Sequence, residues 1–121
     1  DPFEQDDWPA WEKMSNLLVV GDDLTVTNPE RMKKAYQKKA CQGIILKPNQ
    51  IGTVTETIKA AKLAKEFKWK IIVSHRSGDT CDDFIADLAV GISADFIKSV
   101  APARGALISL YNTLLRIEEE I

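Results

Sequence analysis

Polar side chains that could do chemistry follow each of four short apolar runs in this sequence. In chain order they are Asp22 and Asp23, then Lys47 and Asn49, then His75, Arg76 and Ser77, and finally Lys98. Paired carboxylates are good ligands for a hard divalent cation, and an arginine beside a serine suits a phosphate or a carboxylate. A lysine between such groups can act as a general base. The pattern therefore predicts a site that binds an anion and moves a proton.

Each of these groups also has an ordinary structural interpretation. Asp22 and Asp23 could form a turn or cap a helix, and a lysine at the end of a strand is often only solvated. A single histidine more often makes a structural hydrogen bond than binds a ligand. Arg76 could pair with Asp79 or Asp82. Polar groups nevertheless follow all four runs, and this coincidence favours the functional interpretation because loops at one end of a sheet often carry function.

The apolar runs are typical of strands that alternate with helices. The expected strands are 17–20, 44–46, 71–73 and 96–97, and helical patterns cover 7–14, 28–39, 53–68, 82–92 and 103–120. Asn28 before Pro29 marks the start of one helix, and Thr53 with Glu56 forms a capping box at the start of another. Such alternation predicts a single domain over 1–121 with a parallel sheet and right-handed crossovers, its strands buried on both faces.

This topology predicts where the polar groups meet. The carboxyl ends of parallel strands share one edge of the sheet, and ligands bind there. We therefore expect Asp22, Lys47, His75, Arg76, Ser77 and Lys98 to converge. Two arrangements of the α/β units remain open. Helices on one face would indicate part of a TIM-type barrel, and helices on both faces would indicate a flavodoxin-like open sheet.

Composition excludes several classes of protein. The chain is 45% hydrophobic and 28% charged, which is enough for both a core and a polar surface. Its net charge of −2 provides no basic excess for nucleic acid. The apolar runs are too short to cross a membrane, and no signal-peptide pattern is present. Cys41 and Cys81 lack metal-ligand spacing, so we expect two reduced thiols in a cytoplasmic protein.

Six segments resemble enolase, the phosphopyruvate hydratase family, in order and with compatible spacing. They are "DPFEQDDWPAW", "VVGDDLTVTNPERM", "ILKPNQIGTVTET", "VSHRSGDT", "FIADLAVG" and "YNTLLRIEEE". The stretches "GDDLTVTNP", "NQIGTVTE" and "SHRSG" are the most specific. The resemblance implies the C-terminal half of an eight-stranded α/β barrel. It also implies a reaction, the dehydration of 2-phosphoglycerate to phosphoenolpyruvate with Mg²⁺.

The resemblance also implies a role for each site residue. Asp22 would bind Mg²⁺, Lys47 would be the base, and His75 would close over the substrate. The phosphate would lie against Arg76 and Ser77, and the substrate carboxylate against Lys98. These roles suit the chemistry, because removing a proton beside a carboxylate builds an enediolate that needs concentrated positive charge.

In the family this chain resembles, further catalytic groups would lie upstream of Asp1. They include two more metal-binding carboxylates and the glutamate that assists loss of the hydroxyl group. We therefore expect the isolated chain to be inactive, and to need an N-terminal half or self-association. Two alternatives stay open: a catalytically silent α/β scaffold, excised or engineered, and a module that binds small anions.

The chain departs from the family pattern near its end. Val100 stands where the family commonly has glycine, and Ala106, Leu107 and Leu110 stand where it has charged residues. The apolar face predicted for 103–120 is therefore unusually wide. Either this face is buried within a fragment adapted to fold alone, or it packs against another chain, because exposed apolar surface and open sheet edges invite association.

Overall fold

The computed structural model describes residues 1–14, 16–76, 82–99 and 105–121. Every segment predicted as a helix contains one, and the single turn α3 was not foreseen. The helices are α1 (Trp8–Glu12), α2 (Pro29–Gln37), α3 (Pro48–Ile51), α4 (Val54–Glu66), α5 (Phe84–Gly91) and α6 (Gly105–Glu120). The strands are β1 (Val20–Gly21), β2 (Gly43–Leu46), β3 (Lys70–Ser74) and β4 (Phe96–Lys98).

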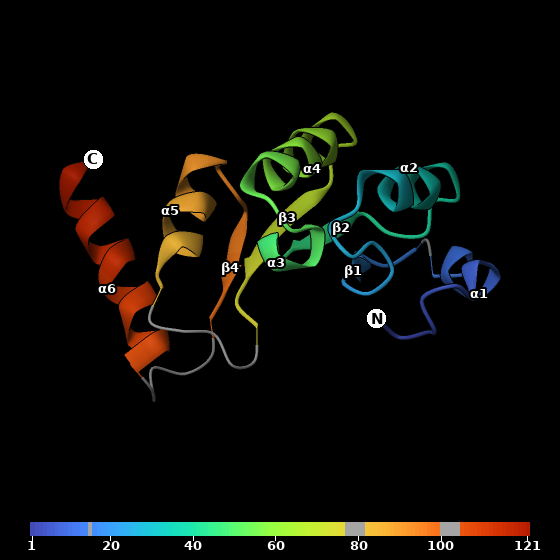
Figure 1. The fold of residues 1–121 in the computed structure, drawn as a ribbon. Coiled ribbons are helices and arrows are strands. Elements are labelled where there is room, and N and C mark those ends of the chain that lie inside the picture. Colours follow the sequence, from blue (N-terminus) through green and yellow to red (C-terminus); the bar gives the residue numbers. More distant parts are fainter. Residues whose placement is uncertain (15, 77–81, 100–104) are drawn as a thin grey trace.

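The four strands form one sheet in chain order. The order is β1-β2-β3-β4, and every neighbouring pair is parallel. Consecutive strands therefore lie side by side, each joined to the next through a segment that contains a helix (Figure 1). The predicted parallel α/β sheet is confirmed.

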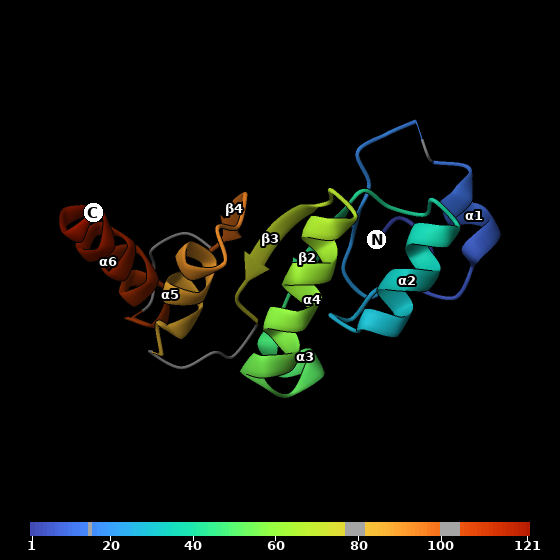
Figure 2. The same ribbon diagram turned by 90° about the horizontal axis from the view of Figure 1, so that it is seen from above.

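Helices cover one face of this sheet. Helix α4 packs on β2 and β3, α5 packs on β3 and β4, and α2 lies beside α4. Seen from above, the three helices lie on the same side of the strands (Figure 2). Ile44, Leu46, Ile71 and Val73 are almost fully buried. Of the two predicted arrangements, this one matches part of a barrel and differs from an open sheet with helices on both faces.

The other face of the sheet has no such cover in the described ranges. Side chains alternate along a strand, so Ile45 and Ile72 point away from the buried Ile44 and Ile71. The register aligns Ile45 with Ile72 and Ile72 with Phe96 in one row across the sheet. Phe96 is 59% exposed, and the two isoleucines are only partly buried. The expectation that the strands are buried on both faces is wrong here, because no second layer covers this row.

The first strand is shorter than predicted and begins later. Pairing with β2 starts only at Val20, which is opposite Gly43. Before that point the Gln42 side chain accepts a hydrogen bond from the Val19 backbone N–H at 3.0 Å, and the Val19 carbonyl accepts the Gln42 backbone N–H at 2.8 Å. Leu17 and Leu18 are left 60% and 65% exposed. The apolar run 17–20 therefore predicted a strand three residues too early, since β1 begins at Val20.

The predicted helix starts are confirmed in detail. The Asn28 side chain accepts hydrogen bonds from the backbone N–H groups of Glu30 and Arg31. The Thr53 hydroxyl oxygen accepts the Glu56 N–H at 3.1 Å and donates to the Glu56 carboxylate at 2.7 Å. These caps satisfy backbone donors that the first helical turn leaves without partners.

The last helix is only partly buried. Helix α6 packs mainly against α5, and Leu110 and Thr113 provide its buried side. The Thr113 hydroxyl donates to the Asp83 carboxylate, which also accepts from Arg116, and these contacts tie α6 to the start of α5. Tyr111 and Leu115 stay exposed. Leu110, one of the three apolar replacements, is therefore buried within this chain, whereas the side chains of Ala106 and Leu107 lie outside the described residues, and both explanations of the apolar face stay open.

Two further observations bear on the sequence predictions. No helix in the described ranges is long and apolar enough to cross a membrane.

Burial raises the pKa of the Cys41 thiol to about 12, although hydrogen bonds with Gly43 and Gly21 lower it. Cys41 is a free, buried thiol, and a thiol that remains protonated is a poor nucleophile and metal ligand. Cys81 and Val100 lie outside the described residues.

Candidate functional site

The centre of the candidate site is an ion pair between neighbouring strand ends. The Lys47 ammonium lies 2.6 Å from Asp22 Oδ2 and 2.8 Å from Asp22 Oδ1. The two side chains are 14% and 20% exposed, so water screens the pair less than it would at the surface. The prediction that these two residues converge is confirmed.

The sheet itself positions this pair. Asp22 comes directly after β1 and Lys47 directly after β2, and the register of the two strands places Gly21 opposite Ile44. At Gly21 an added Cβ would lie 3.2 Å from the Thr25 methyl group and 3.3 Å from Leu24, so a side chain there would require these neighbours to shift by a few tenths of an ångström. The loop that follows Gly21 holds the Asp22 carboxylate toward Lys47.

Two residues that the sequence analysis did not single out complete this network. The Thr27 hydroxyl accepts the Lys47 backbone N–H at 3.0 Å and donates to Gln50 Oε1 at 3.0 Å. Gln50 Nε2 then donates to Asp22 Oδ1 at 3.4 Å. The predicted Asn49 is exposed instead, because the single turn of α3 directs Gln50, three residues after Lys47, back toward the site.

The loop that supplies Thr27 is strained. Val26 and Thr27 have φ angles of 43° and 57°, a region that β-branched residues rarely adopt. Such a conformation costs about 1–3 kcal/mol per residue and persists only where the surroundings fix it. Strain of this kind clusters at functional sites, and here it places the Thr27 hydroxyl between Lys47 and Gln50.

A second pair of predicted residues meets at the ends of β3 and β4. The Lys98 carbonyl accepts from the His75 backbone N–H at 3.3 Å and lies 2.8 Å from His75 Nδ1. A carbonyl only accepts hydrogen bonds, so Nδ1 carries the proton and Nε2 is left for another partner. The structure therefore brings His75 to the Lys98 backbone, while the Lys98 side chain is exposed.

The two pairs lie at the same edge of the sheet. Leu46 is opposite Val73 and Ser74 is opposite Lys98, so Lys47, Ser74 and Lys98 follow one another across three strands. No hydrogen bond or ion pair within the described ranges joins the first pair to the second. Arg76 lies two residues beyond the end of β3 and is exposed. Ser77, the predicted partner of Arg76, lies outside the described residues.

Three carboxylates gather at the end of β1. Carboxylate oxygens of Asp1, Asp22 and Asp23 lie within 4.8 Å of one another. Asp1 also accepts hydrogen bonds from the backbone N–H groups of Asp22 at 3.0 Å and Asp23 at 2.7 Å. Oxygen donors of this kind fit Mg²⁺. A carboxylate offers about four lone-pair positions, so Asp22 has acceptor capacity for a cation besides Lys47.

Comparison with known protein families agrees with this architecture. The family model for the enolase C-terminal TIM-barrel domain matches residues 1–121. A TIM barrel has eight parallel strands with helices outside and its active site at the carboxyl ends of the strands. The described residues supply four such strands with helices on one face. The chain therefore belongs to the family of the enolase C-terminal TIM-barrel domain.

Proposed function

We propose that this chain is the C-terminal catalytic portion of an enolase, which dehydrates 2-phosphoglycerate to phosphoenolpyruvate in the complete, cytoplasmic enzyme. Family membership supports the reaction class. The observation that carries the proposal is the direct contact between Asp22 and Lys47 at the carboxyl edge of the sheet. This contact places the lysine that is assigned as the base beside a carboxylate able to bind a cation.

In this proposal Lys47 is the general base. Its Nζ, as the free amine, takes the proton from the carbon beside the substrate carboxylate, and the electron pair moves into that carboxylate as an enediolate. The double bond then forms as hydroxide leaves the neighbouring carbon and takes a proton from the glutamate that the family resemblance places upstream of Asp1, which gives water. Asp22 would hold Mg²⁺ together with the two carboxylates that the family resemblance places upstream of Asp1. When bound, the cation supplies positive charge that stabilises the enediolate.

The neighbouring strand ends would bind the two anionic ends of the substrate. Arg76 and Ser77 are assigned to the phosphate, and Lys98 to the carboxylate, because guanidinium, hydroxyl and ammonium groups all donate to such oxygens. His75 is assigned to the closing position over the substrate. Its Nδ1 contact with the Lys98 carbonyl holds the ring and leaves Nε2 available.

We also propose that the chain alone does not turn over substrate. Lys98 and Arg76 are exposed, and the sheet face below them carries the exposed Phe96. Proton abstraction beside a carboxylate depends on a site that excludes water and concentrates charge. The same openness supports the alternative, a catalytically silent α/β scaffold that keeps enolase residues without using them.

A complementation assay separates these two functions. The chain is mixed with Mg²⁺, 2-phosphoglycerate and a separately produced N-terminal half of an enolase barrel, and phosphoenolpyruvate is measured. We expect turnover in the mixture and none from either half alone. Lys47→Ala should lower the rate about 10²–10⁴-fold, while Lys62→Ala, on the exposed side of α4, should not. If a mixture that forms a complex shows no turnover, the chain is a silent scaffold.

A further inference from the structure

A cavity of about 300 Å³ opens at the amino edge of the sheet, where α2 and α4 end side by side. The residues that line it are Tyr36, Lys39, Cys41, Gln42, Phe67, Lys68 and Trp69. They come shortly before Gly43 and Lys70, which are the first residues of β2 and β3 and pair with each other across the sheet. The cavity therefore lies at the opposite end of the strands from Asp22 and Lys47.

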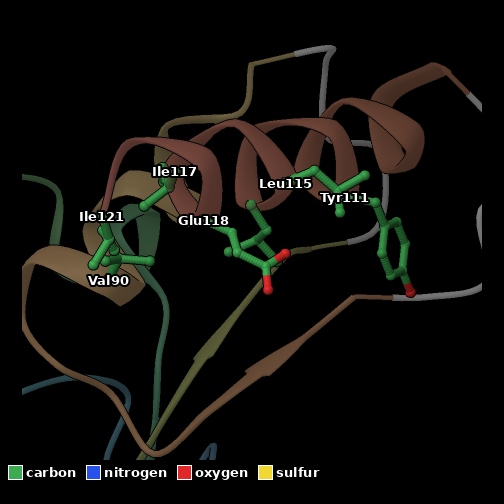
Figure 3. Close-up of a pocket in the computed structure, with 7 residues that line it drawn as sticks. Val90, Tyr111, Leu115, Ile117, Glu118 and Ile121 are labelled. Carbon is green, nitrogen blue, oxygen red and sulfur yellow. The ribbon is translucent and has the colours of Figure 1, made fainter.

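A larger opening lies between α5 and α6, but its walls carry different chemistry. Its volume is about 590 Å³, and mostly apolar side chains line it (Figure 3). Glu118 is the one charged residue among the described residues in its walls. The smaller cavity is lined instead by two lysines and three aromatic rings. Its walls therefore specify the kind of ligand that would bind, whereas the walls of the larger opening do not.

Three aromatic rings supply the apolar part of the smaller cavity. The rings of Tyr36 and Phe67 are stacked, with centroids 4.0 Å apart and an angle of 9° between their planes. Trp69 meets Phe67 edge to face, with centroids 5.3 Å apart. Tyr36 is nevertheless 49% exposed, so part of its ring surface stays open. Aromatic surfaces of this kind pack well against a further planar ring.

Two polar groups in the cavity walls are hydrogen-bond donors that lack an acceptor. Trp69 is only 6% exposed, and its indole N–H has no acceptor among the described residues. In the same ranges no side-chain nitrogen or oxygen is sealed from solvent without a partner. The indole N–H therefore reaches solvent, and the cavity is the opening that Trp69 lines. Gln42 uses its Oε1 to accept the Val19 N–H, while its Nε2 has no acceptor in the described part of the chain. Both groups are suited to an acceptor oxygen.

Lys39 and Lys68 add positive charge to the cavity. Neither lysine forms an ion pair with any residue that the structure describes. By contrast Lys38, the neighbour of Lys39 in the chain, lies 2.8 Å from the Glu12 carboxylate. None of the described residues in the cavity walls is acidic. The charge that complements these walls is therefore negative.

We propose that this cavity is a second ligand site, which binds a small planar aromatic anion such as an aryl carboxylate. The ring of the ligand packs against the aromatic wall, and its anionic oxygens meet the lysine ammonium groups and the free N–H donors. A volume of about 300 Å³ is at the small end of ligand pockets, which suits one ring or two fused rings. The inference does not depend on catalysis at the other end of the strands.

Titration of the chain with 2-naphthoate tests the proposal, with the NMR signal of the Trp69 indole N–H as the readout. We expect a saturable shift with a dissociation constant of about 1 mM or less. Two analogues separate the contributions of charge and ring. Neutral 2-naphthamide keeps the rings without the charge, and cyclohexanecarboxylate keeps the charge without an aromatic ring. Each should bind at least about tenfold more weakly than 2-naphthoate. A signal that does not saturate by about 10 mM, or equal affinity for 2-naphthamide, overturns the proposal.

Variants separate a ligand site from lysines that serve only the helix ends. The double variant Lys39→Gly/Lys68→Gly removes both charges at positions with φ angles of 52° and 59°, which glycine adopts easily, so the fold is kept. We expect it to raise the dissociation constant for 2-naphthoate about tenfold, and Tyr36→Ala should do the same. Lys59→Ala removes an exposed charge of α4 outside the cavity and should change nothing. Circular dichroism checks that each variant folds. If the two lysines only complement the helix dipoles, the double variant binds 2-naphthoate as tightly as the wild type, and the proposal is wrong.

Discussion

Asp22 and Lys47 form an ion pair in a partly buried place. The Lys47 side chain is 14% exposed and the Asp22 side chain is 20% exposed. Removing one of the two charges therefore leaves the other poorly solvated. Gln50 adds a weaker hydrogen bond to Asp22, at 3.4 Å. The pair therefore contributes to the stability of the site as well as to its proposed chemistry.

Replacing Asp22 by asparagine should lower the free energy of unfolding by about 1–3 kcal/mol, because Lys47 loses its charged partner. Urea denaturation followed by circular dichroism measures this loss. Lys47→Met provides the second arm of a double-mutant cycle. The two losses should be less than additive, since both variants remove the same interaction. Additive losses would mean that the contact contributes nothing to stability.

Asp95 should make stability depend on pH. The Lys70 ammonium donates to its carboxylate at 2.5 Å and the Ile71 N–H at 2.9 Å, and these hydrogen bonds lower the pKa of Asp95. A carboxyl group whose folded pKa is depressed stabilises the fold above its unfolded pKa and loses that effect as the pH falls through the folded pKa. Asp95→Asn should therefore be less stable than the wild type at neutral pH.

Urea denaturation at several pH values measures the difference between the two proteins. We expect the stability difference to have its full size above about pH 4, the ordinary pKa of aspartate. The difference should become smaller as the pH falls below that value. Lys70→Met removes the main donor and should raise the pKa of Asp95, which flattens the pH dependence. A difference that is constant with pH would contradict this account.

At the scale of elements, three helices end in the same way before a strand. After α2, α4 and α5 the chain passes through Lys39, Lys68 and Ser93, with φ angles of 52°, 59° and 50°. The next residue donates its N–H to a carbonyl five positions earlier, as in Ala40 to Ala35 and Trp69 to Ala64. This is the Schellman arrangement, whose left-handed position usually holds glycine.

Glycine at these positions should stabilise the protein. Lys39→Gly and Lys68→Gly each remove a side chain from a residue whose backbone is in the left-handed conformation. We expect the free energy of unfolding to rise by roughly 0.5–1 kcal/mol after the added entropy of the unfolded chain is subtracted. Thermal or urea unfolding measures it. Lys62→Gly, in the middle of α4, is the control and should lose about 1 kcal/mol. Equal losses in all three variants would show that the left-handed backbone carries no strain.

Local signals in the sequence predicted most elements correctly. Asn28 and Thr53 marked helix starts because short polar side chains cap the first turn, and the alternation of apolar runs with helices predicted the parallel sheet. The strand predicted for 17–20 was placed too early, because apolar character alone does not show which residues pair with a neighbouring strand. Gln50 was missed, since only the turn of α3 brings it to Asp22.

At the scale of the whole molecule, the sheet has a covered face and an open face. Ile71 and Val73 are buried under helices, whereas Phe96 is 59% exposed on the other side. The sequence could not show this difference, because Ile45 and Ile72 are as apolar as the residues that face the helices. The proposed activity depends on it, since the barrel interior lies on the open side and the site lies at its carboxyl edge.

The central claim is that Lys47 removes the proton beside the substrate carboxylate once the open face is covered. The most direct measurement is deuterium exchange at that carbon, followed by mass spectrometry of 2-phosphoglycerate in D₂O with Mg²⁺ and the complementing half-barrel. This readout reports proton removal even when hydroxide does not leave. We predict exchange with the wild type and with Lys62→Ala, and its loss with Lys47→Ala. Exchange that persists in Lys47→Ala would contradict the account.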